Sequence, residues 1–506
     1  MIDYRELFRP YTDPVEFDQI IEYNTVNEMW EHSLKEYADL IAISCNGLSH
    51  TFKELESDIA KFRTTLKSLD LKRGDRVGLY AKNSYEFVYM YLGIVTSGYC
   101  GLIMPPHLDE KTVYGCTLKY SLKAICYGAD LEEKINFTEC VNPSFPLISS
   151  NSLGTEVTPM ANDLNKKDPA VIMFTGGTTG KSKGALLSHG ALMQGCVNGC
   201  YGTWNVFNQK YLLILPFSHV FGLVRNLMTS LYTGSNLFIC LNNKDMFRDC
   251  AIFNPSIIVM VPAIAEMALN LSRQFKRNML GASVKYIICG AANVPPYLIE
   301  EYHKLGVTLL AGYGLTETAN LVSGNPKNLE KSDSVGYPYP HQEFKIVDGE
   351  LWIKGPNLMD SYVGEDEENK KAFVDGWFKT GDLARFDDEG MLYIVGRSKE
   401  IIVLPTGENI SPAEVETNFY NLKIVQDCQV FEDINENGKH ILVLEVVPRM
   451  SELNNINTDD PMKYLMEELK KVNMTLLPFE RMSKIVIRDK DFERTPSMKI
   501  VRYHKC

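Results

Sequence analysis

The chain has 506 residues, of which 45% are hydrophobic and 23% are charged, a balance typical of globular proteins with sizeable apolar cores. This composition excludes disordered, collagen-like and coiled-coil proteins, and the length predicts several domains because one domain usually has about 100–200 residues. The formal net charge is -12, which disfavours binding to nucleic acid and to anionic membrane surfaces. A polyanionic ligand would therefore need a local, positively charged site.

The N-terminus and the cysteines indicate the compartment. Met1–Glu6 contains charged residues where a signal peptide would have its apolar stretch, so we expect a cytoplasmic protein. Polar residues and prolines interrupt the most apolar stretch, Ala251–Leu271, which predicts that it does not span a membrane. The closest pair of cysteines, Cys196 and Cys200, has no second pair at zinc-binding spacing, and this favours reduced, buried thiols.

The first two thirds of the chain alternate between strand and helix patterns. Val77–Tyr80 predicts a strand, Asn83–Glu86 predicts a capping box at the start of a helix, and Cys100–Met104 predicts the next strand. The alternation predicts further strands at Ala170–Phe174, Tyr211–Leu215, Ile257–Val261 and Tyr286–Cys289. We therefore expect an α/β protein with largely parallel sheets.

The pattern changes near residue 334. Short alternating runs such as Glu350–Lys354 and Met391–Val395 predict a β-rich subdomain over about residues 334–396. Ser411 and Pro412 then predict the start of a helix. Later patterns predict elements at Val425–Phe431, Ile441–Val447, Asp460–Asn473 and Lys484–Ile487, with a turn at Asn435–Gly438. We expect an N-terminal domain of residues 1–396 and an α+β C-terminal domain of residues 397–506.

A loop rich in glycine and hydroxyl residues follows one of the predicted strands. Thr175–Gly184 contains four glycines, three threonines, one serine and two lysines. Glycines let backbone N–H groups approach phosphate oxygens, hydroxyls add donors, and lysines add positive charge. The loop therefore predicts a polyphosphate site. It differs from a Walker A loop because Thr175 stands where that loop requires its first glycine.

This loop resembles the phosphate-loop signature of the adenylate-forming (AMP-binding) superfamily of acyl-CoA synthetases, peptide-synthetase adenylation domains and luciferases. Four further segments resemble the family's motifs and follow in the family's order: Gly312–Thr318, Trp377–Asp382, Gly396–Ile402 with Gly407–Pro412, and Thr495–Lys499. Weaker matches at Thr51–Leu55 and Gly349–Gly355 extend the resemblance over essentially the whole chain. Acyl-CoA synthetases are the most similar branch.

The resemblance implies a large N-terminal domain of two α/β lobes plus the β-rich subdomain, and a small, mobile α+β C-terminal domain. It also implies an acid–thiol ligase. A carboxylate attacks the α-phosphate of ATP to give an acyl-adenylate and pyrophosphate, and a thiol, with CoA expected, then displaces AMP. ATP, Mg²⁺ and CoA are the expected cofactors. Both reactants of the first step are anions, so catalysis must chiefly neutralise and align charge.

The resemblance assigns nucleotide-binding roles to particular residues. Glu317 would ligate Mg²⁺, Thr316 would bond the α-phosphate, and Tyr313, between Gly312 and Gly314, would stack on adenine. The phosphate loop would contribute Thr175, Gly176, Gly177, Thr178, Thr179, Gly180 and Lys183.

Further roles fall on the second half of the chain. Asp382 would accept hydrogen bonds from both ribose hydroxyls, as a carboxylate with two oxygens can, and Arg397 would contact ribose or phosphate. Lys499 would reach into the site during adenylation as a compact positive charge. Lys399 would be the hinge about which the C-terminal domain swings, so that the Gly407 segment lines the thiol tunnel in the second step.

The acyl pocket is the least determined part of the resemblance. His219 stands where acyl- and aryl-CoA synthetases carry a histidine beside the carboxylate, whereas amino-acid-activating domains usually carry an aspartate. It therefore argues against an α-amino acid substrate. Gly290 and Ala291 would form the strand edge that faces adenine and substrate. Ile401–Ile410 is most similar to fatty-acyl-CoA ligases.

The chain departs from the family pattern at three positions. Gly177 replaces the usual serine, and Ser182 replaces a common proline. Met498 stands in place of the glycine before Lys499, and its side chain narrows the backbone angles available to that loop. This last departure bears on the efficiency of adenylation.

Four other functions remain open at this point. A stand-alone adenylating enzyme would pass its acyl group to the phosphopantetheine thiol of a separate carrier protein and would ignore free CoA. A non-catalytic sensor of nucleotide or acyl-adenylate would keep the fold, and Met498 is the one hint of it. A P-loop NTPase would hydrolyse ATP to ADP without an acid. Luciferase-like oxygenation is the least favoured of these alternatives, because the segment Tyr503–Cys506 lacks the peroxisomal tripeptide.

Overall fold

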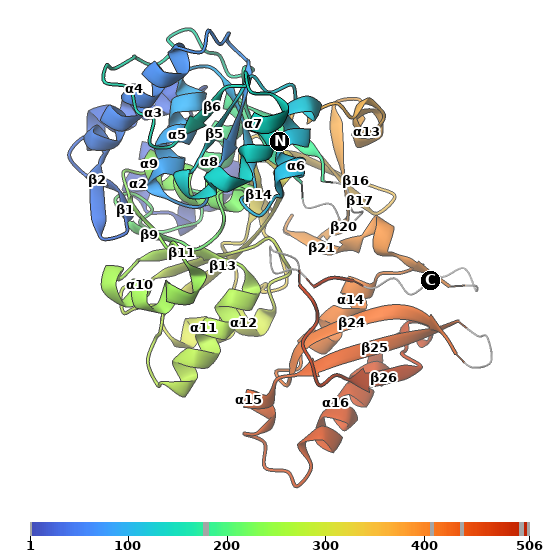
Figure 1. The fold of residues 1–506 in the computed structure, drawn as a ribbon. Helices are drawn as coiled ribbons and strands as arrows, with labels where there is room; N and C mark the ends of the chain where they lie inside the picture. The colour runs from blue at the N-terminus through green and yellow to red at the C-terminus, as the bar shows by residue number, and fades with distance from the viewer. Residues whose placement is uncertain (1–2, 176–181, 405–408, 436–439, 495–499, 503–506) are drawn as a thin grey trace.

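The computed structural model describes residues 3–175, 182–404, 409–435, 440–494 and 500–502. A nine-stranded sheet and a seven-stranded sheet form most of the large N-terminal domain, which lies in the upper part of Figure 1. The first sheet has the order β15-β14-β13-β12-β11-β9-β10-β1-β2 and the second the order β18-β8-β7-β4-β3-β5-β6. Strands β1, β9–β13 of the first sheet and β3–β7 of the second pair in parallel, which confirms the predicted α/β fold with largely parallel sheets.

The strands of the nine-stranded sheet are β1 (Ile41–Cys45), β2 (Leu48–Thr51), β9 (Lys210–Leu213), β10 (Asn236–Ile239), β11 (Ile257–Met260), β12 (Tyr286–Cys289), β13 (Thr308–Leu315), β14 (Asn320–Gly324) and β15 (Tyr337–Pro338). Those of the seven-stranded sheet are β3 (Arg76–Tyr80), β4 (Cys100–Met104), β5 (Ala124–Tyr127), β6 (Leu147–Ser149), β7 (Pro169–Phe174), β8 (Gly184–Ser188) and β18 (Ser361–Tyr362). The predicted strands therefore occur, with ends shifted by up to two residues.

Helices fill the space between the two large sheets. The helices of this domain are α1 (Tyr4–Phe8), α2 (Pro14–Gln19), α3 (Val26–Tyr37), α4 (Phe52–Lys67), α5 (Tyr85–Thr96), α6 (Glu110–Lys119), α7 (Asn136–Val141), α8 (His189–Asn198), the π-helical η3 (Phe221–Met228), α9 (Thr229–Tyr232), α10 (Met246–Phe253), α11 (Pro262–Gln274), α12 (Pro296–Lys304) and α13 (Asp366–Ala372). Helix α5 contacts strands of both sheets, as does α8. An almost entirely apolar helix such as α5 is stable only when it is buried on all sides. Its N-cap is Ser84, whose hydroxyl accepts the Phe87 backbone N–H at 3.1 Å. Asn83, where the predicted capping box begins, instead bonds the backbone of Leu215 and Phe217.

A third sheet follows in the chain. Its strands are β16 (Glu343–Val347), β17 (Glu350–Lys354), β19 (Phe373–Val374), β20 (Trp377–Phe386) and β21 (Leu392–Arg397). Two short strands from the same part of the sequence join the large sheets instead, since β15 pairs with β14 and β18 pairs with β8. The β-rich segment is thereby tied to both lobes.

The small C-terminal domain has its own apolar core around Leu444, Leu465 and Phe419. Its elements are β22 (Ile402–Val403), β23 (Asn409–Ile410), α14 (Pro412–Tyr420), β24 (Val425–Ile434), β25 (His440–Pro448), α15 (Met450–Leu453), α16 (Pro461–Thr475) and β26 (Lys484–Ile487). Figure 1 shows this domain below the β20–β21 sheet and beside α11 and α12. The predicted turn at 435–438 lies largely outside the described residues.

Ser411 differs from its predicted role. It does stand directly before α14, but its hydroxyl makes no capping hydrogen bond to the helix. Instead it donates to the backbone oxygen of Val395 at 2.6 Å. The helix start is therefore tied to β21, a contact that a local capping pattern cannot predict.

Charged side chains hold the C-terminal domain against α11 and α12. The Arg449 Nε lies 2.6 Å from a Glu266 carboxylate oxygen, and the guanidinium lies 4.1 Å from the centroid of the Tyr297 ring. The Glu301 carboxylate accepts a hydrogen bond from Arg273 Nη2 at 2.6 Å and one from Lys423 Nζ at 3.4 Å. Because Arg449 is almost fully buried, this contact is part of the packing rather than a screened surface pair.

Two expectations about the chain as a whole can be compared with the structure. None of the helices in the described ranges is long and apolar enough to cross a membrane. Every cysteine in those ranges is a free thiol, and all except Cys140 are buried, in line with the predicted reduced thiols.

His189 predicts a pH dependence of folding stability. It is fully buried at the start of α8, where its Nδ1 accepts the Val26 backbone N–H at 3.3 Å, and burial lowers its pKa from 6.5 to about 4. As the pH falls, the unfolded chain therefore takes up this proton at a higher pH than the folded chain does. The free energy of unfolding consequently falls by about 3 kcal/mol between pH 6.5 and pH 4.

Urea unfolding at pH 7 and pH 5 checks this expectation. His189→Asn keeps an acceptor for Val26 without titrating, and should lose less stability over this range than the wild type. His303→Asn, at an exposed histidine on α12, is the matched control and should follow the wild type. Equal losses in wild type and His189→Asn would contradict the assignment.

Candidate active site

The phosphate loop starts and ends on paired backbone. β7 and β8 are antiparallel neighbours, and the Thr175 N–H donates to the Lys183 backbone oxygen at 2.9 Å just beyond them. The Ser182 hydroxyl donates to the Thr175 backbone oxygen at 2.8 Å. Thr175 and Lys183 therefore close the base of the loop. The other predicted loop residues lie outside the described residues: Gly176, Gly177, Thr178, Thr179 and Gly180.

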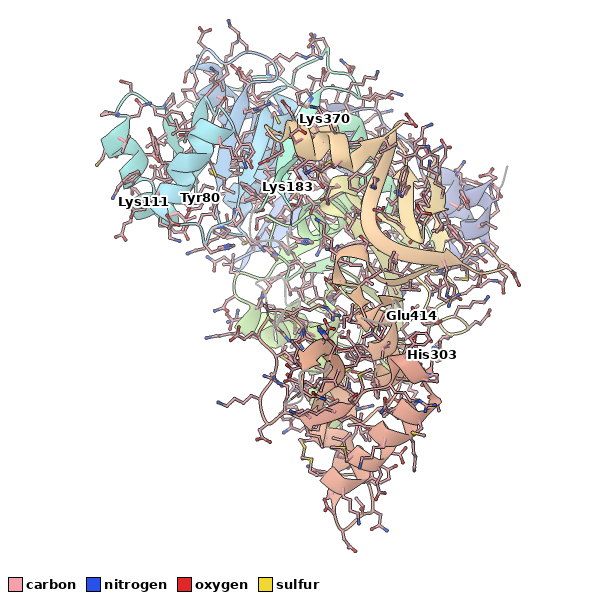
Figure 2. All side chains as sticks on the ribbon, turned by 90° about the vertical axis from the view of Figure 1, so that its right-hand side faces the viewer. Tyr80, Lys111, Lys183, His303, Lys370 and Glu414 are labelled. Atoms are coloured by element: carbon pink, nitrogen blue, oxygen red, sulfur yellow. The ribbon has the colours of Figure 1, made fainter. Side chains whose placement is uncertain are left out.

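Lys183 is held by an acidic residue of α13. Its Nζ lies 2.5 Å from a Glu368 carboxylate oxygen and 4.8 Å from the centroid of the Tyr362 ring. The hydrogen bond from Lys183, together with that from Lys371, lowers the pKa of Glu368 to about 2. Figure 2 shows Lys183 beside the helix that carries Lys370. The positive charge of Lys183, which is predicted to bind phosphate, is thus neutralised by Glu368 of the same chain.

Glu317 lies close to the same tyrosine. The Tyr362 hydroxyl donates to Glu317 Oε1 at 2.7 Å, and the Met359 N–H donates to the Glu317 backbone oxygen at 2.7 Å. Thr316, in the same 3₁₀ turn η5 (Thr316–Thr318), is buried. Tyr362 therefore contacts both Lys183 and Glu317, and so joins motifs that come from different sheets.

A second polar cluster surrounds Asp382. The Tyr313 hydroxyl donates to Asp382 Oδ2 at 2.5 Å, and Arg397 Nε lies 2.8 Å from Oδ1. Asp382 and Arg397 are paired residues of β20 and β21. Burial, and then the Asp382 charge, raise the pKa of Tyr313 well above its usual range. Each carboxylate oxygen can accept further hydrogen bonds, so the cluster can still bind a hydroxyl.

The backbone near Tyr313 requires small residues. A Cβ on Gly314 would lie 2.1 Å from the Asn320 backbone oxygen, so only glycine fits between β13 and β14. Gly290 follows β12 and Gly312 lies on β13, and a Cβ on Gly290 would lie 3.6 Å from the Gly312 oxygen. Ala291 has φ 66°, a left-handed conformation that is costly for a residue with a Cβ. The chain turns sharply where the substrate edge is predicted.

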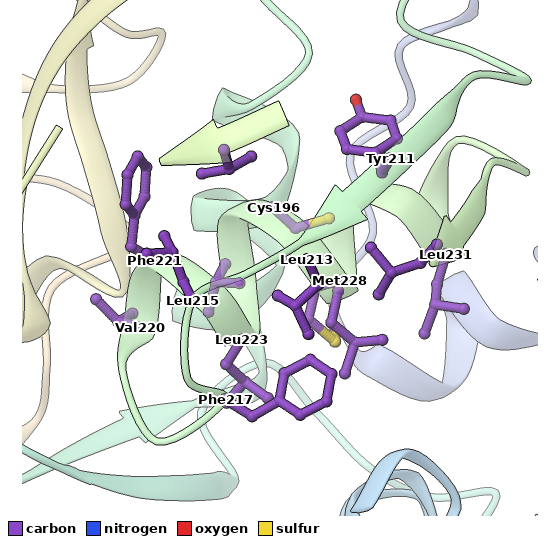
Figure 3. Packing of buried hydrophobic residues seen from close by; sticks show 14 of the residues in the cluster. Cys196, Tyr211, Leu213, Leu215, Phe217, Val220, Phe221, Leu223, Met228 and Leu231 are labelled. Carbon is purple, nitrogen blue, oxygen red and sulfur yellow. The ribbon is translucent and has the colours of Figure 1, made fainter. Parts of the chain in front are cut away.

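His219 lies at the start of η3. Its Nδ1 accepts the Phe221 N–H at 3.2 Å, and its side chain is half-buried. The Phe221 ring packs against Gly290, since a Cβ there would lie 3.3 Å from it. Figure 3 shows Phe221 at one end of a packed cluster that joins η3 to β9. π-Helical segments are rare and occur frequently at functional sites, and η3 extends over eight residues.

The predicted hinge residue and the predicted catalytic lysine are the last of the sequence-based assignments. Lys399 is exposed in the 3₁₀ turn η6 (Ser398–Glu400), between β21 and β22. Met498 and Lys499 lie outside the described residues, as does Gly407. The predicted residues that are described thus gather around β7–β8, the β12–β14 edge and the β20–β21 sheet.

Two functional contacts were not foreseen from the sequence. Tyr362 and Glu368 lie outside every motif, and Glu368 stands three residues before Lys371, as in an ordinary exposed helix. A wide hollow of about 440 Å³ lined by His107, Lys111 and Phe137 touches none of the predicted site residues.

Residues 30–363 match the family described as AMP-binding enzyme, which is more than half of the chain. The chain belongs to this family. The family that the resemblance predicted is therefore confirmed.

This AMP-binding enzyme is similar to proteins named as CoA ligases. It is 28% identical to 4-coumarate--CoA ligase-like 6 of Arabidopsis thaliana, over 95% of this chain and 89% of that protein. It is 29% identical to the long-chain-fatty-acid--CoA ligase of Escherichia coli O6:H1, over 78% of this chain and 80% of that protein. The solved structure of anthranilate CoA ligase AuaEII with anthranoyl-AMP has a TM-score of 0.82 at 19% identity, covering 95% of this chain and 96% of that one. The last likeness shows the shared fold.

The Lys183–Glu368 pair predicts a change in nucleotide affinity. Glu368→Gln should strengthen ATP binding about two- to fivefold, the range of a partly exposed ion pair, because a triphosphate would no longer compete with a carboxylate for Lys183. Isothermal titration calorimetry measures the affinity for ATP. Glu367→Gln, whose partner Lys370 lies on the same exposed helix, should leave the affinity unchanged. Weaker ATP binding by Glu368→Gln would refute the competition.

Proposed function

We propose that this AMP-binding enzyme is an acid–CoA ligase that converts a carboxylic acid and ATP to an acyl-adenylate and pyrophosphate, then to an acyl-CoA and AMP. The observation that carries the proposal is the meeting of Lys183 and Glu317 at Tyr362, because it joins a cation and a carboxylate from two separate motifs. Such a pair suits a reaction in which an anionic carboxylate approaches an anionic phosphate. The CoA ligase names of the similar proteins support it.

We assign the phosphates to the loop that Thr175 and Lys183 close, with Lys183 released from Glu368 as the triphosphate binds. Thr316 bonds the α-phosphate. His219 lies beside the acid's carboxylate and orients it. These groups hold the two reactants in line and offset their mutual repulsion, which is the main barrier to the first step.

We assign the nucleoside to the Asp382 cluster. Asp382 accepts the ribose hydroxyls with its remaining acceptor sites, and Arg397 holds the carboxylate in place and adds charge near the phosphates. Tyr313 stacks on adenine while its hydroxyl keeps the bond to Asp382. Gly290, Ala291, Gly312 and Gly314 form the close-packed backbone edge beside the base.

The residues present also fit Mg²⁺. No group of three or more acidic, histidine or cysteine side chains gathers in the described ranges, whereas Mg²⁺ in nucleotide sites usually takes one or two carboxylates plus substrate phosphates and water. Glu317 supplies that carboxylate, oriented by Tyr362. When bound, Mg²⁺ would offset negative charge on the phosphates.

The second step needs a rearrangement of the C-terminal domain. We place its start at residue 397 and its hinge at the exposed Lys399, with residues 1–396 as the N-terminal domain and 334–396 as its β-rich part. Lys499 adds a positive charge at the reacting carboxylate during adenylation. When the Arg449–Glu266 contact breaks, the domain can turn and open a path for the thiol.

The acceptor thiol and the compartment are parts of the same proposal. CoA is assigned because the similar curated proteins are named CoA ligases, and the cytoplasm because CoA and ATP are available there. Transfer to the phosphopantetheine of a separate carrier protein is the alternative, and it predicts that free CoA is not consumed.

Acid-dependent ATP–pyrophosphate exchange tests the first step. Exchange should require an acid, and a panel of short, medium and long fatty acids, aryl acids and amino acids should give it with one class only. Adding CoA should then yield AMP and a thioester. ADP and phosphate without acid would support the P-loop NTPase instead, and no exchange with any acid would support the sensor.

Lys499→Ala tests the lysine assignment. Removing the charge that steadies the developing anions should lower exchange at least about 100-fold, while ATP binding by calorimetry persists. Lys471→Ala, at an exposed lysine of α16 paired with Glu468, is the control and should exchange at the wild-type rate. Unchanged exchange in Lys499→Ala would remove the lysine from the mechanism.

A further inference from the structure

Three arginines of the described residues are almost fully buried, and one of them is unpaired. Arg63 is paired with Glu56, and Arg449 is paired with Glu266 at 2.6 Å. Arg225 is 2% exposed, and its Nη1 has no hydrogen-bond partner within the described part of the chain. A buried charge without a partner is strongly unfavourable, and a guanidinium stays charged in proteins. Arg225 therefore destabilises the fold unless something binds it.

The surroundings of Arg225 are polar but carry no described carboxylate in ion-pair contact. Its charge acts on the hydroxyls of Tyr211 and Tyr339, and burial raises the pKa of both to about 12. The Tyr211 hydroxyl is itself buried without a partner in hydrogen-bond geometry. Arg225 and Tyr211 therefore lie close enough to interact, and Arg225 lines a small cavity together with Tyr339.

A cavity of about 20 Å³ adjoins Arg225, room for about one water-sized group. Its walls include Ile288 on β12 and Leu310 on β13, which are paired neighbours in the sheet. Gly290 and Gly312 lie two residues further along these chains, so their side-chain directions share that face of the sheet. Two residues of strand span about 7 Å. The cavity therefore lies a short step behind the proposed substrate edge.

Phe221 lies beside the proposed substrate edge and shares η3 with Arg225. Its ring packs against Gly290, as the 3.3 Å approach to a Cβ there shows, and it precedes Arg225 by four residues on η3. Residues four apart on a helix lie on similar sides. Figure 3 shows Phe221 and Tyr211 at opposite ends of the cluster on η3 and β9. An acid whose carboxylate reacts at Gly290 would pass Phe221 before it met Arg225.

We propose that Arg225 binds a second anionic group of the acid, so that the substrates are dicarboxylic acids or acids with another anion at the end remote from the reacting carboxylate. This rests on the proposed function, which places the reacting carboxylate near Gly290. A guanidinium binds a carboxylate with two parallel hydrogen bonds. Because the cavity is small, binding includes a turn of the Phe221 ring, a side-chain change that is common on binding.

The same contact would let the enzyme discriminate between dicarboxylic acids and fatty acids. A fatty acid with a methyl end would leave the guanidinium desolvated and unpaired, whereas a dicarboxylic acid would satisfy it. Sites with buried polar groups reject analogues that lack the matching group far more strongly than apolar pockets reject a changed methylene. The fold thus selects by charge at the far end of the acid rather than by apolar length alone.

Matched pairs of acids test the proposal. CoA-dependent AMP formation is measured with pentanoate and glutarate, and with hexanoate and adipate. The wild type should favour each dicarboxylate at least about tenfold in kcat/KM. Arg225→Met should lower kcat/KM for the dicarboxylates at least about 100-fold and leave the monocarboxylates unchanged or improved. A wild-type preference for monocarboxylates that Arg225→Met does not alter would overturn the proposal.

Stability separates a binding role from a structural one. Replacing an unpaired buried charge by an apolar side chain should raise the melting temperature of Arg225→Met. Arg63→Met removes an arginine that is fully paired, so it should lower the melting temperature and leave the ratio between acids unchanged. If the melting temperature of Arg225→Met falls and its kcat/KM ratio between dicarboxylates and monocarboxylates is unchanged, Arg225 serves packing alone.

A binding measurement without catalysis separates this proposal from the proposed function. Glutarate should raise the melting temperature of the wild type, pentanoate at equal concentration should raise it less, and Arg225→Met should lose the difference. If monocarboxylates react and glutarate gives no added shift, the Arg225 proposal fails and the ligase stands. If no acid reacts but the glutarate shift depends on Arg225, the ligase fails and the anion site stands.

Discussion

The charged side chains assigned to the nucleotide already have partners within the chain, whose net charge is -12. Lys183 is held by Glu368, Glu317 by the Tyr362 hydroxyl, and Asp382 by Arg397 and Tyr313. Each pair places a charge at a lower desolvation cost than an isolated charge would incur. In the proposed function, the nucleotide would exchange with partners that are already in position, so little would have to be ordered on binding.

The two large sheets make this arrangement possible. Lys183 lies between β7 and β8 of one sheet, whereas Tyr313 lies on β13 of the other and Glu317 comes just after that strand. Buried helices such as α5 and α8 contact both sheets and so fix their separation. The short strands β15 and β18 tie the β-rich segment to the same frame, which brings Asp382 and Tyr362 to the two motifs from a third direction.

The almost fully buried arginines differ in whether they have a carboxylate partner, and so in whether they contribute to stability. Arg63 is paired and contributes to packing, and Arg449 holds the small domain against α11 and α12. Arg225 has no such partner, and places where a local rule of folding is broken are expected at functional sites. An unpaired guanidinium behind the acyl edge is costly for folding and valuable for selection, because it makes binding energy depend on the chemistry of the substrate's far end.

The sequence by itself determined the strand and helix pattern and the parallel α/β fold, because these follow from periodicity along the chain. Tyr313, Thr316 and Glu317 were singled out by the resemblance of their segment to a motif of the family. Only the tertiary structure decided that Tyr362 meets Glu317 across 45 residues and that Glu368 meets Lys183 across 185. It also decided that the Ser411 hydroxyl bonds Val395 instead of capping α14, and that Arg225 is left unpaired. Such contacts depend on how distant elements pack, and no local pattern encodes that packing.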